Sequence, residues 1–130
     1  MSQENVELVR RGVHAFNERD LDAFLALADD DCLYVVALPF DGEYRGHDGL
    51  RRWWTELFDA APDFTAEVVE VREHGDLTVS CVRYRGHGAG SDAPFEQVRW
   101  QVGEWRDGKL VELRTYASDS EALEAAGLRE

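Results

Sequence analysis

The order in which two kinds of hydrophobic pattern follow one another constrains the fold of this chain most strongly. Over residues 1–58 apolar residues recur mostly at helical spacing, whereas strand-forming residues dominate residues 64–116 and a short helical pattern follows. Helices followed by a run of antiparallel strands predict one α+β domain over residues 1–130, in which helices cover a curved sheet. Such a sheet forms a cup whose concave face can hold a pocket.

The predicted elements are three helices before the main run of strands and one after it. The helical patterns cover Gln3 to Glu18, Leu21 to Ala28, His47 to Asp59 and Glu121 to Ala126. The strand patterns cover Cys32 to Leu38, Phe64 to Glu73, Leu77 to His87, Phe95 to Arg106 and Leu110 to Tyr116, with a short addition at Tyr44 and Arg45. The expected helix caps are Ser2, Asp20 and either Asp119 or Ser120. The three aspartates at 29–31 are expected to form a solvated turn, because negative charge is unfavourable at a helix C-terminus.

Charge and composition exclude several classes of partner. The chain has 27 acidic and 14 basic residues, which gives a formal net charge of −13. Because this charge repels phosphate backbones and anionic lipids, neither nucleic acid nor a membrane is expected as a partner. The sequence has neither a secretory signal pattern nor an apolar run of roughly 20 residues, so we expect a cytoplasmic protein. Cys32 and Cys81 lie without metal-site spacing in predicted strands, so we expect buried thiols, no metal and no organic cofactor.

Several short motifs occur in an order that resembles a known family. They are AFNERDLD at 15–22, ADDD at 28–31, YRG at 44–46, DGKLV at 107–111 and RTY at 114–116. Together they resemble the SnoaL-like branch of the nuclear-transport-factor-2-like superfamily, over nearly the whole chain. The resemblance implies a cone-shaped α+β barrel with a deep apolar pocket, commonly dimeric. Members include polyketide cyclases, ketosteroid isomerases, limonene epoxide hydrolases and proteins with no catalytic role.

The catalytic residues of these relatives are not matched here. The resemblance places the tyrosine of ketosteroid isomerases at Gly12, their general-base aspartate near Val35 and their second aspartate near Gln101. The acidic residue that related epoxide hydrolases and cyclases often carry on the last strand falls at Thr115. Because none of these side chains accepts a proton at neutral pH, we do not expect a mechanism copied from these relatives.

Period-two alternation along three strands predicts which side chains share the concave face. The residues expected there are Ser80, Val82, Tyr84, Arg99, Gln101, Gly103, Val111, Leu113 and Thr115. Val35 is expected to join them from the first strand, and Phe16, Trp54 and Phe58 are expected to roof the pocket from the helices. Mostly apolar walls with a few polar groups are typical of sites for small apolar molecules.

Three polar side chains are the expected ligand contacts. Arg99 is the candidate anchor, because an inward guanidinium keeps its charge and needs a carboxylate or a bound anion. Two other interpretations are open: Arg99 pairs with an acid from a helix or loop, or the register is off by one and the side chain faces solvent. Gln101 and Tyr84 either orient a ligand carbonyl or hydroxyl or form hydrogen bonds within the core.

Acid–base chemistry has two weak candidates, His87 at a strand end and Asp63 after Pro62. For His87 the alternative is an ordinary surface position, and for Asp63 it is a cap or turn. Two functions therefore remain open. The chain is either a cofactor-independent isomerase, cyclase or hydrolase acting on an apolar carbonyl compound, or a non-catalytic module for ligand binding or dimerisation.

The outward face of the predicted sheet carries Val98, Trp100 and Val102. This face is too apolar to meet water comfortably, because soluble monomers rarely expose large contiguous apolar patches. The pattern therefore predicts a homodimer formed through this face.

Overall fold

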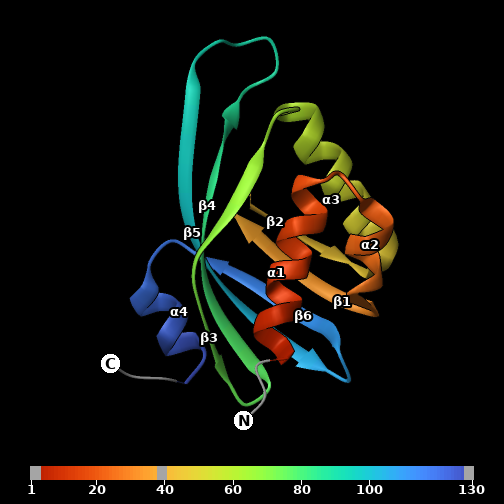
Figure 1. Cartoon of the computed structure of the whole chain (residues 1–130), viewed down its shortest axis with the longest axis vertical. Helices are drawn as coiled ribbons and strands as arrows, with labels where there is room; N and C mark the ends of the chain where they lie inside the picture. The colour runs from red at the N-terminus through yellow and green to blue at the C-terminus, as the bar shows by residue number, and fades with distance from the viewer. Residues whose placement is uncertain (1–3, 38–40, 128–130) are drawn as a thin grey trace.

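The computed structural model describes residues 4–37 and 41–127 of the chain. Within them the helices are α1 (Glu4–Asn17), α2 (Leu21–Ala26), α3 (Gly46–Ala60) and α4 (Asp119–Ala125). The strands are β1 (Ala28–Ala37), β2 (Asp41–Arg45), β3 (Thr65–His74), β4 (Leu77–His87), β5 (Pro94–Arg106) and β6 (Lys109–Tyr116). They form one sheet in the order β2-β1-β6-β5-β4-β3, in which β1 and β6 pair parallel and the other described pairs are antiparallel (Figure 1).

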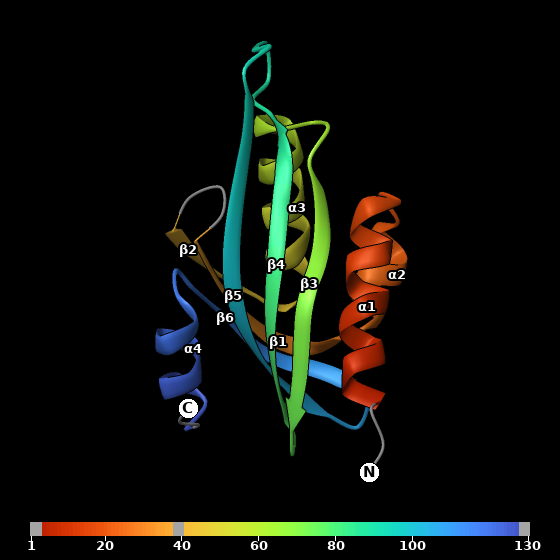
Figure 2. The same ribbon diagram turned by 60° about the vertical axis from the view of Figure 1, so that its left-hand side comes forward.

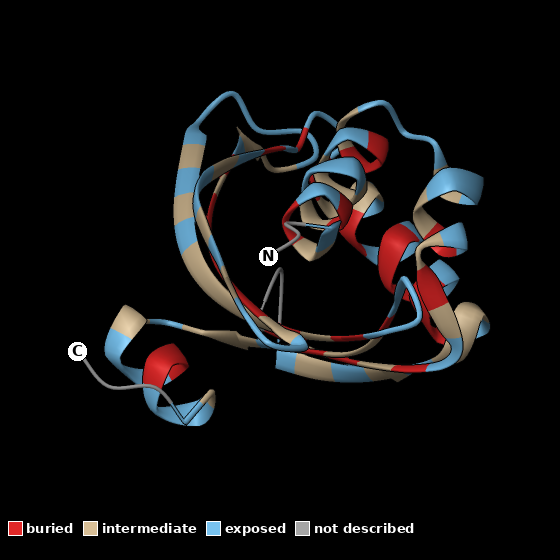
Figure 3. Ribbon diagram, turned by 60° about the horizontal axis from the view of Figure 1, so that its bottom comes forward, coloured by how far each residue is buried: buried red, intermediate tan, exposed pale blue. Residues whose placement is uncertain are grey.

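The sheet is strongly curved, and helices cover its two faces unequally. Viewed from below, the strands curve around α1, α2 and α3, while α4 lies outside the curve (Figure 3). The ends of β4 and β5 project beyond the other strands as a long hairpin (Figure 2). The predicted α+β fold, a curved sheet covered by the N-terminal helices, is confirmed, and the sheet does not close into a full barrel.

Apolar stripes on the helices build the core on the concave side. On α3 the buried residues Leu50, Trp53, Trp54 and Leu57 follow the i, i+3, i+4, i+7 spacing of one helix face. Leu50 and Leu57 are completely inaccessible, and full burial of such a side chain contributes about 1.5–3 kcal/mol. Within the described residues, no helix combines the length and the apolar character needed to cross a membrane.

A tight corner between α1 and α2 is tied to the segment that follows α3. Arg19 has a left-handed backbone (φ 60°), and its side chain donates hydrogen bonds to Pro62 O at 2.9 Å and Phe64 O at 2.7 Å. Its guanidinium lies 3.9 Å from the centre of the Phe58 ring. These contacts hold the first two helices against the entry to β3.

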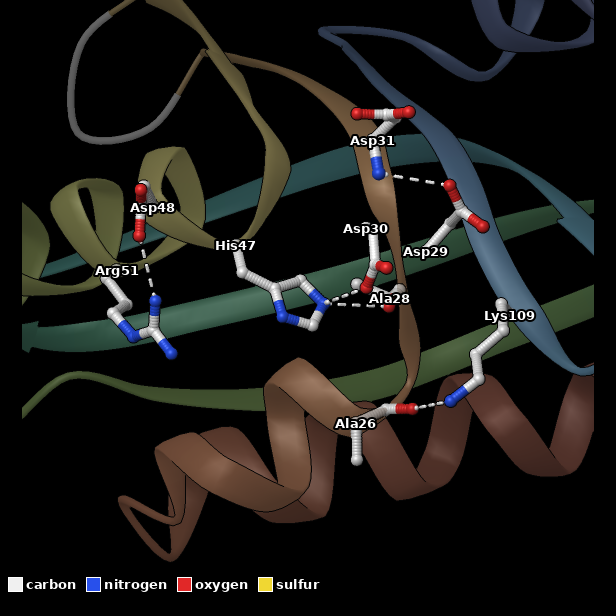
Figure 4. A network of polar contacts seen from close by, with 9 residues as sticks. All are labelled: Ala26, Ala28, Asp29, Asp30, Asp31, His47, Asp48, Arg51 and Lys109. Carbon is white, nitrogen blue, oxygen red and sulfur yellow. Dashed lines mark hydrogen bonds and ion pairs between the residues drawn. The ribbon is translucent and has the colours of Figure 1, made fainter.

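The three aspartates at 29–31 lie in β1 and not in a turn, which corrects the predicted end of α2. The pairing of β1 with β6 is irregular at this point. Asp30 and Asp31 are exposed, and Asp29 is half-buried. The Asp31 N–H donates to Asp29 Oδ2 at 3.0 Å, and His47 Nε2 lies 2.9 Å from Ala28 O and 4.0 Å from Asp30 Oδ1 (Figure 4). Because Asp30 and Asp31 are exposed and Asp29 is half-buried, solvent screens the three like charges that this strand carries.

The predicted helix caps are confirmed in one case and wrong in another. The Asp20 side chain accepts from Ala23 N at 3.1 Å and caps α2 as expected. Ser118, and not Asp119 or Ser120, caps α4, because Ser118 is the residue in extended conformation whose oxygen accepts a backbone N–H three residues on. The predicted boundary residues outside the described part of the chain are Ser2, Gln3 and Leu38.

The strand register confirms most of the predicted concave face. The pairs on this face are Ser80 with Gln101, Val82 with Arg99, Gln101 with Thr115 and Gly103 with Leu113. Val111 is an exception, because the β5–β6 register shifts between Glu104 and Trp105. Leu110 pairs with Trp105 and takes the place expected for Val111.

The outer face of the sheet is less bare than its sequence indicates. Trp100 and Val102 pack with Ala122 and Leu123 of α4, so the last helix partly covers the stretch expected to form a dimer. Val98, with 38% of its surface exposed, is the member of the predicted patch that stays open.

Candidate functional site

A cavity of about 80 Å³ lies between the concave face of the sheet and helices α1, α2 and α3. Its apolar lining comes from Leu8, Val9, Gly12, Val13, Phe16, Phe24, Leu27, Ala28, Leu50, Trp53, Ala66, Leu110 and Leu113. Its polar lining comes from Tyr34, Thr78, Ser80, Tyr84, Gln101 and Trp105. The side chains with polar atoms come mainly from the sheet, whereas the helices supply apolar wall.

Tyr84 and Gln101 form the clearest polar group in the cavity. Gln101 Nε2 donates to the Tyr84 hydroxyl oxygen at 2.8 Å. The Tyr84 ring stacks on Phe64 with centroids 5.5 Å apart, which fixes the direction of the phenol. Burial raises the pKa of Tyr84 to about 12, although the Gln101 hydrogen bond and the nearby charge of Arg99 act in the opposite direction. Tyr84 is therefore a neutral hydrogen-bonding group at neutral pH.

Tyr34 is a lining residue that the sequence analysis missed. Its side chain is 7% exposed, and its ring packs edge-on against Trp53 with centroids 5.0 Å apart. Burial raises the pKa of Tyr34 well above its usual value, and nearby Tyr84 adds to this effect. Val35, the residue expected in the pocket, pairs with Glu43 and Arg114 on the opposite face of the sheet. The expectation for Val35 is therefore wrong by one residue.

A second missed group closes the lower end of the cavity. Trp105 Nε1 donates to Thr78 Oγ1 at 3.0 Å, and both side chains are buried. Gly103 lies against this pair: a Cβ at this position would meet Thr78 Oγ1 at 3.0 Å and Trp105 Nε1 at 3.2 Å. The period-two alternation that selected Ser80 also passes through Thr78, so this residue had a usable signal in the sequence.

The helical roof of the cavity differs from the expectation at two adjacent residues of α3, Trp53 and Trp54. Phe16 lines the cavity as expected, but Trp53 and not Trp54 is its indole from α3. Trp54 and Phe58 pack behind Phe16, with ring centroids 5.8 and 5.0 Å from it. They support the roof without lining the cavity.

Of the other residues expected on the concave face, some line the cavity and others do not. Ser80 and Leu113 line the cavity as expected. Val82 is completely buried in the core and does not line the cavity. Thr115 is half-buried, also outside the lining, and its Oγ1 has no hydrogen-bond partner in the described part of the chain.

Arg99 shares the predicted face but does not line the cavity. It pairs with Val82, so the register is as expected and an off-by-one register is excluded. Arg99 Nη1 donates to Val98 O at 3.0 Å, and among the described residues no carboxylate lies within ion-pair distance. Its positive charge is near enough to Tyr84 to oppose, in part, the rise of the pKa of Tyr84 that burial causes.

The structure brings Asp63 and His87 together, but not at the cavity. Asp63 Oδ2 lies 2.7 Å from His87 Nδ1, and Asp63 Oδ1 accepts from the His87 N–H at 2.8 Å. The hydrogen bond from His87 lowers the pKa of Asp63. The pair lines an open surface groove at the base of the projecting hairpin, and buried Phe64, stacked on Tyr84, follows Asp63 directly in the chain. Neither side chain lines the cavity.

A curved, open six-stranded sheet whose concave face encloses an apolar cavity beneath helices defines the class of cone-shaped α+β proteins. A family model described as the SnoaL-like domain matches residues 9–113, and the protein therefore belongs to the SnoaL-like family. A search of curated proteins found no similar relative.

Solved structures support the same fold. A protein of ketosteroid isomerase-like fold from Catenulispora acidiphila, in complex with trimethylamine, shares 20% identity over 95% of this chain and 94% of its own, with a TM-score of 0.78. An NTF2-like protein from Burkholderia pseudomallei shares 20% identity over 95% of this chain and 97% of its own, with a TM-score of 0.81. IdmH, a candidate polyketide cyclase from Streptomyces antibioticus, shares 24% identity over 98% of this chain and 100% of its own, with a TM-score of 0.76. At these identities the likeness shows the fold alone.

Proposed function

We propose that the protein binds a small, largely apolar molecule carrying a carbonyl or anionic group, with Tyr84 and Gln101 as its polar contacts. The observation that carries this proposal is the Gln101–Tyr84 hydrogen bond of 2.8 Å in the wall of an otherwise mostly apolar cavity. Apolar walls with a few oriented polar groups are the usual composition of small-molecule sites. A related fold in complex with trimethylamine adds support for a small ligand.

The cavity volume limits the ligand that fits without rearrangement. About 80 Å³ is roughly half of the ~150 Å³ cavity that accommodates benzene. A larger ligand must displace the aromatic side chains that fill the concave side, of which Phe24 and Trp53 are lining members from the helices. The two rings stack with centroids 6.0 Å apart and would move together.

Arg99 is the proposed anchor only for an anionic ligand. The side chain lies outside the lining, but its charge acts on Tyr84 and the described residues offer it no carboxylate. An anionic group would therefore extend from the cavity toward Arg99, whereas a carbonyl would stay at Tyr84 and Gln101.

Binding without catalysis is the form of this function that the lining supports. Among the described lining residues none is a carboxylate or an imidazole, and Asp63 and His87 lie elsewhere. Proton transfer to or from carbon needs such a group within hydrogen-bond reach. Cofactor-independent isomerase, cyclase or hydrolase chemistry is the second proposal, favoured by Tyr84, because a buried phenol can stabilise negative charge on a ligand oxygen.

We also propose a homodimer through the outer face of β5. Val98 is exposed on this face, and α4, which packs on Trp100 and Val102, would have to form part of the interface. Sedimentation at micromolar concentration tests this assembly, and a monomer there would exclude it.

A thermal-shift screen tests the binding proposal. Wild type, Arg99→Ala and the matched control Arg114→Ala, whose arginine lies on the opposite face of β6, would be screened against carbonyl compounds, carboxylates, steroids, aromatic polyketides and epoxides. A ligand that binds only the native state raises the melting temperature. A carboxylate effect lost only in Arg99→Ala identifies the anchor, and carbonyl effects kept in all three show that carbonyl compounds bind without Arg99. If no compound in the library raises the melting temperature, a non-catalytic dimerisation module becomes the favoured interpretation.

Catalysis is tested separately on any ketone that binds. Nuclear magnetic resonance in D₂O follows deuterium exchange at the carbon next to the carbonyl. Exchange no faster than in buffer supports a binding protein, whereas exchange that saturates with ligand supports an enzyme.

A further inference from the structure

Two buried phenols line the cavity from opposite parts of the sheet. Tyr34 lies on β1 and Tyr84 on β4, and they are 7% and 6% exposed. In the strand order, β6 and β5 separate their strands, so the two side chains reach the same cavity from its two sides. Tyr84 is close enough to Tyr34 to influence its ionisation, although burial is the larger cause of the raised pKa.

The hydrogen-bonding capacity of these phenols is not used up by the protein. A phenol has one O–H to donate and lone pairs that accept. Tyr84 accepts from Gln101 and has no acceptor for its own proton among the described residues. Tyr34 forms no hydrogen bond within the described part of the chain, where its neighbours include the rings of Phe24 and Trp53. The Tyr34 hydroxyl is not among the fully enclosed polar atoms that lack a partner, and both phenols line the cavity, so an acceptor entering it can receive a hydrogen bond from each.

The rest of the lining decides which acceptor fits. Among the described lining residues none carries a formal charge at neutral pH. Thr78 already accepts from Trp105, whereas the Ser80 hydroxyl forms no side-chain hydrogen bond within the described part of the chain. A carboxylate or an ammonium group held entirely within this lining would have no counter-charge among the lining residues, and Arg99 lies outside the lining, so burial of such a group is strongly unfavourable. A neutral oxygen acceptor has no such cost.

We propose that Tyr34 and Tyr84 both donate to the oxygen of a neutral carbonyl ligand, and that Tyr34 determines the preference for carbonyl compounds over hydrocarbons of the same shape. The inference rests on the proposed binding function and narrows its ligand to ketones, aldehydes or quinones. The hydrocarbon part of the ligand then lies against the apolar wall formed by α1 and α2, for example Val13 and Leu27.

The test uses two ligands of nearly equal shape, cyclopentanone and methylenecyclopentane, in which a CH₂ group replaces the carbonyl oxygen. Each has six non-hydrogen atoms, as benzene has, so both require the same displacement of Phe24 and Trp53 and the comparison isolates the carbonyl oxygen. Dissociation constants would be measured by amide chemical-shift titration for wild type, Tyr34→Phe, Tyr84→Phe and the control Tyr44→Phe. Tyr44 is a suitable control because its hydroxyl donates to Glu56 at the surface, at 2.6 Å. We expect wild type and Tyr44→Phe to bind the ketone more tightly than the hydrocarbon. In Tyr34→Phe and in Tyr84→Phe, the ratio of the hydrocarbon dissociation constant to the ketone dissociation constant should fall about five-fold.

The stability of the unliganded variants gives a second measurement. Tyr34→Phe removes a hydroxyl that has no partner in the described part of the chain, so its melting temperature should equal or exceed that of wild type. Tyr84→Phe loses the Gln101 hydrogen bond and should melt lower. A clearly lower melting temperature for Tyr34→Phe would mean that its hydroxyl has a structural partner, and would overturn the inference.

The outcomes separate this inference from the proposed function. Equal affinity of wild type for the two ligands, or a ketone preference that survives in Tyr34→Phe, overturns the role of Tyr34 and leaves binding in the cavity intact. Binding of neither ligand at concentrations up to their solubility overturns the proposed function for ligands of this size, and the inference with it.

Discussion

Gly12 lies in the middle of α1 and faces the cavity, so its replacement by alanine probes helix propensity and packing together. A Cβ at this position would meet Leu27 Cδ1 at 3.8 Å, an ordinary contact, and the backbone is not in the left-handed region. Glycine in a helix interior costs about 1 kcal/mol relative to alanine. With an unfolding entropy of about 2.1 cal/mol/K per residue, 130 residues give roughly 0.27 kcal/mol/K. Gly12→Ala should therefore raise the melting temperature by about 3–4 °C.

Gly49 provides a contrasting position, because it lies in the first turn of α3, close to the backbone of Tyr44. A Cβ there would meet the Tyr44 carbonyl carbon at 3.1 Å and its Cα at 3.4 Å, and backbone atoms cannot rotate away. Overpacking of this kind costs about 1–3 kcal/mol, which offsets the propensity gain. Calorimetry of both variants should show Gly12→Ala above wild type and Gly49→Ala at or below it. If Gly49→Ala is stabilised as much as Gly12→Ala, the contact reasoning is wrong.

Three further predictions follow from individual contacts. The pKa of Asp63 is lowered by the His87 hydrogen bond, so the stability that Asp63→Asn removes should be present above about pH 4 and lost as the pH falls below it, as measured by thermal melts across pH. Trp105→Phe leaves buried Thr78 without its donor and should lower the unfolding free energy by about 1–3 kcal/mol in urea titrations. The Cys32 thiol, completely buried with its pKa raised by that burial to about 12, should react with Ellman's reagent only on unfolding.

Each of these has a result that would contradict it. A constant difference between wild type and Asp63→Asn down to pH 2 would mean that the ion pair does not contribute through the carboxylate. An unchanged urea midpoint for Trp105→Phe would show that its hydrogen bond contributes no net stability. Reaction of Cys32 at the rate of a free thiol in native buffer would show that the strand beneath α3 opens readily.

The sequence predicted the concave face where strands alternate regularly and failed where alternation stops. On β4 the inward positions of Ser80 and Tyr84 follow from period two alone. On β1 the run from Tyr34 to Val36 is apolar at every position, so no local pattern says which residues face inward. The side is set by the parallel pairing of Tyr34 with Leu113, a contact between residues far apart in the chain. The resemblance to ketosteroid isomerases placed Val35 in the pocket, and no local pattern on this strand contradicted it.

The same limit applies to Trp53 and Trp54. Adjacent helical residues point about 100° apart, and both indoles are buried, so the hydrophobic pattern of α3 does not distinguish them. Phe16 of α1 contacts both indoles, with ring centroids 6.1 Å from Trp53 and 5.8 Å from Trp54, and only Trp53 lines the cavity with it. Local periodicity therefore predicted that α3 covers the pocket, but tertiary packing decides which side chain forms its surface.

The lower end of the cavity depends on one irregularity in the β5–β6 pairing. In a regular antiparallel register, the pairing of Gly103 with Leu113 would place Trp105 opposite Val111. The register instead shifts between Glu104 and Trp105. The shift pairs Trp105 with Leu110 and brings both to the cavity, where the indole reaches Thr78. Glycine at 103 favours this arrangement, because a Cβ there would meet Thr78 Oγ1 at 3.0 Å and Trp105 Nε1 at 3.2 Å and would require these side chains to shift. Gly103 and the bulge therefore fix the floor of the cavity together, and with it how deep a ligand held at Tyr84 can lie.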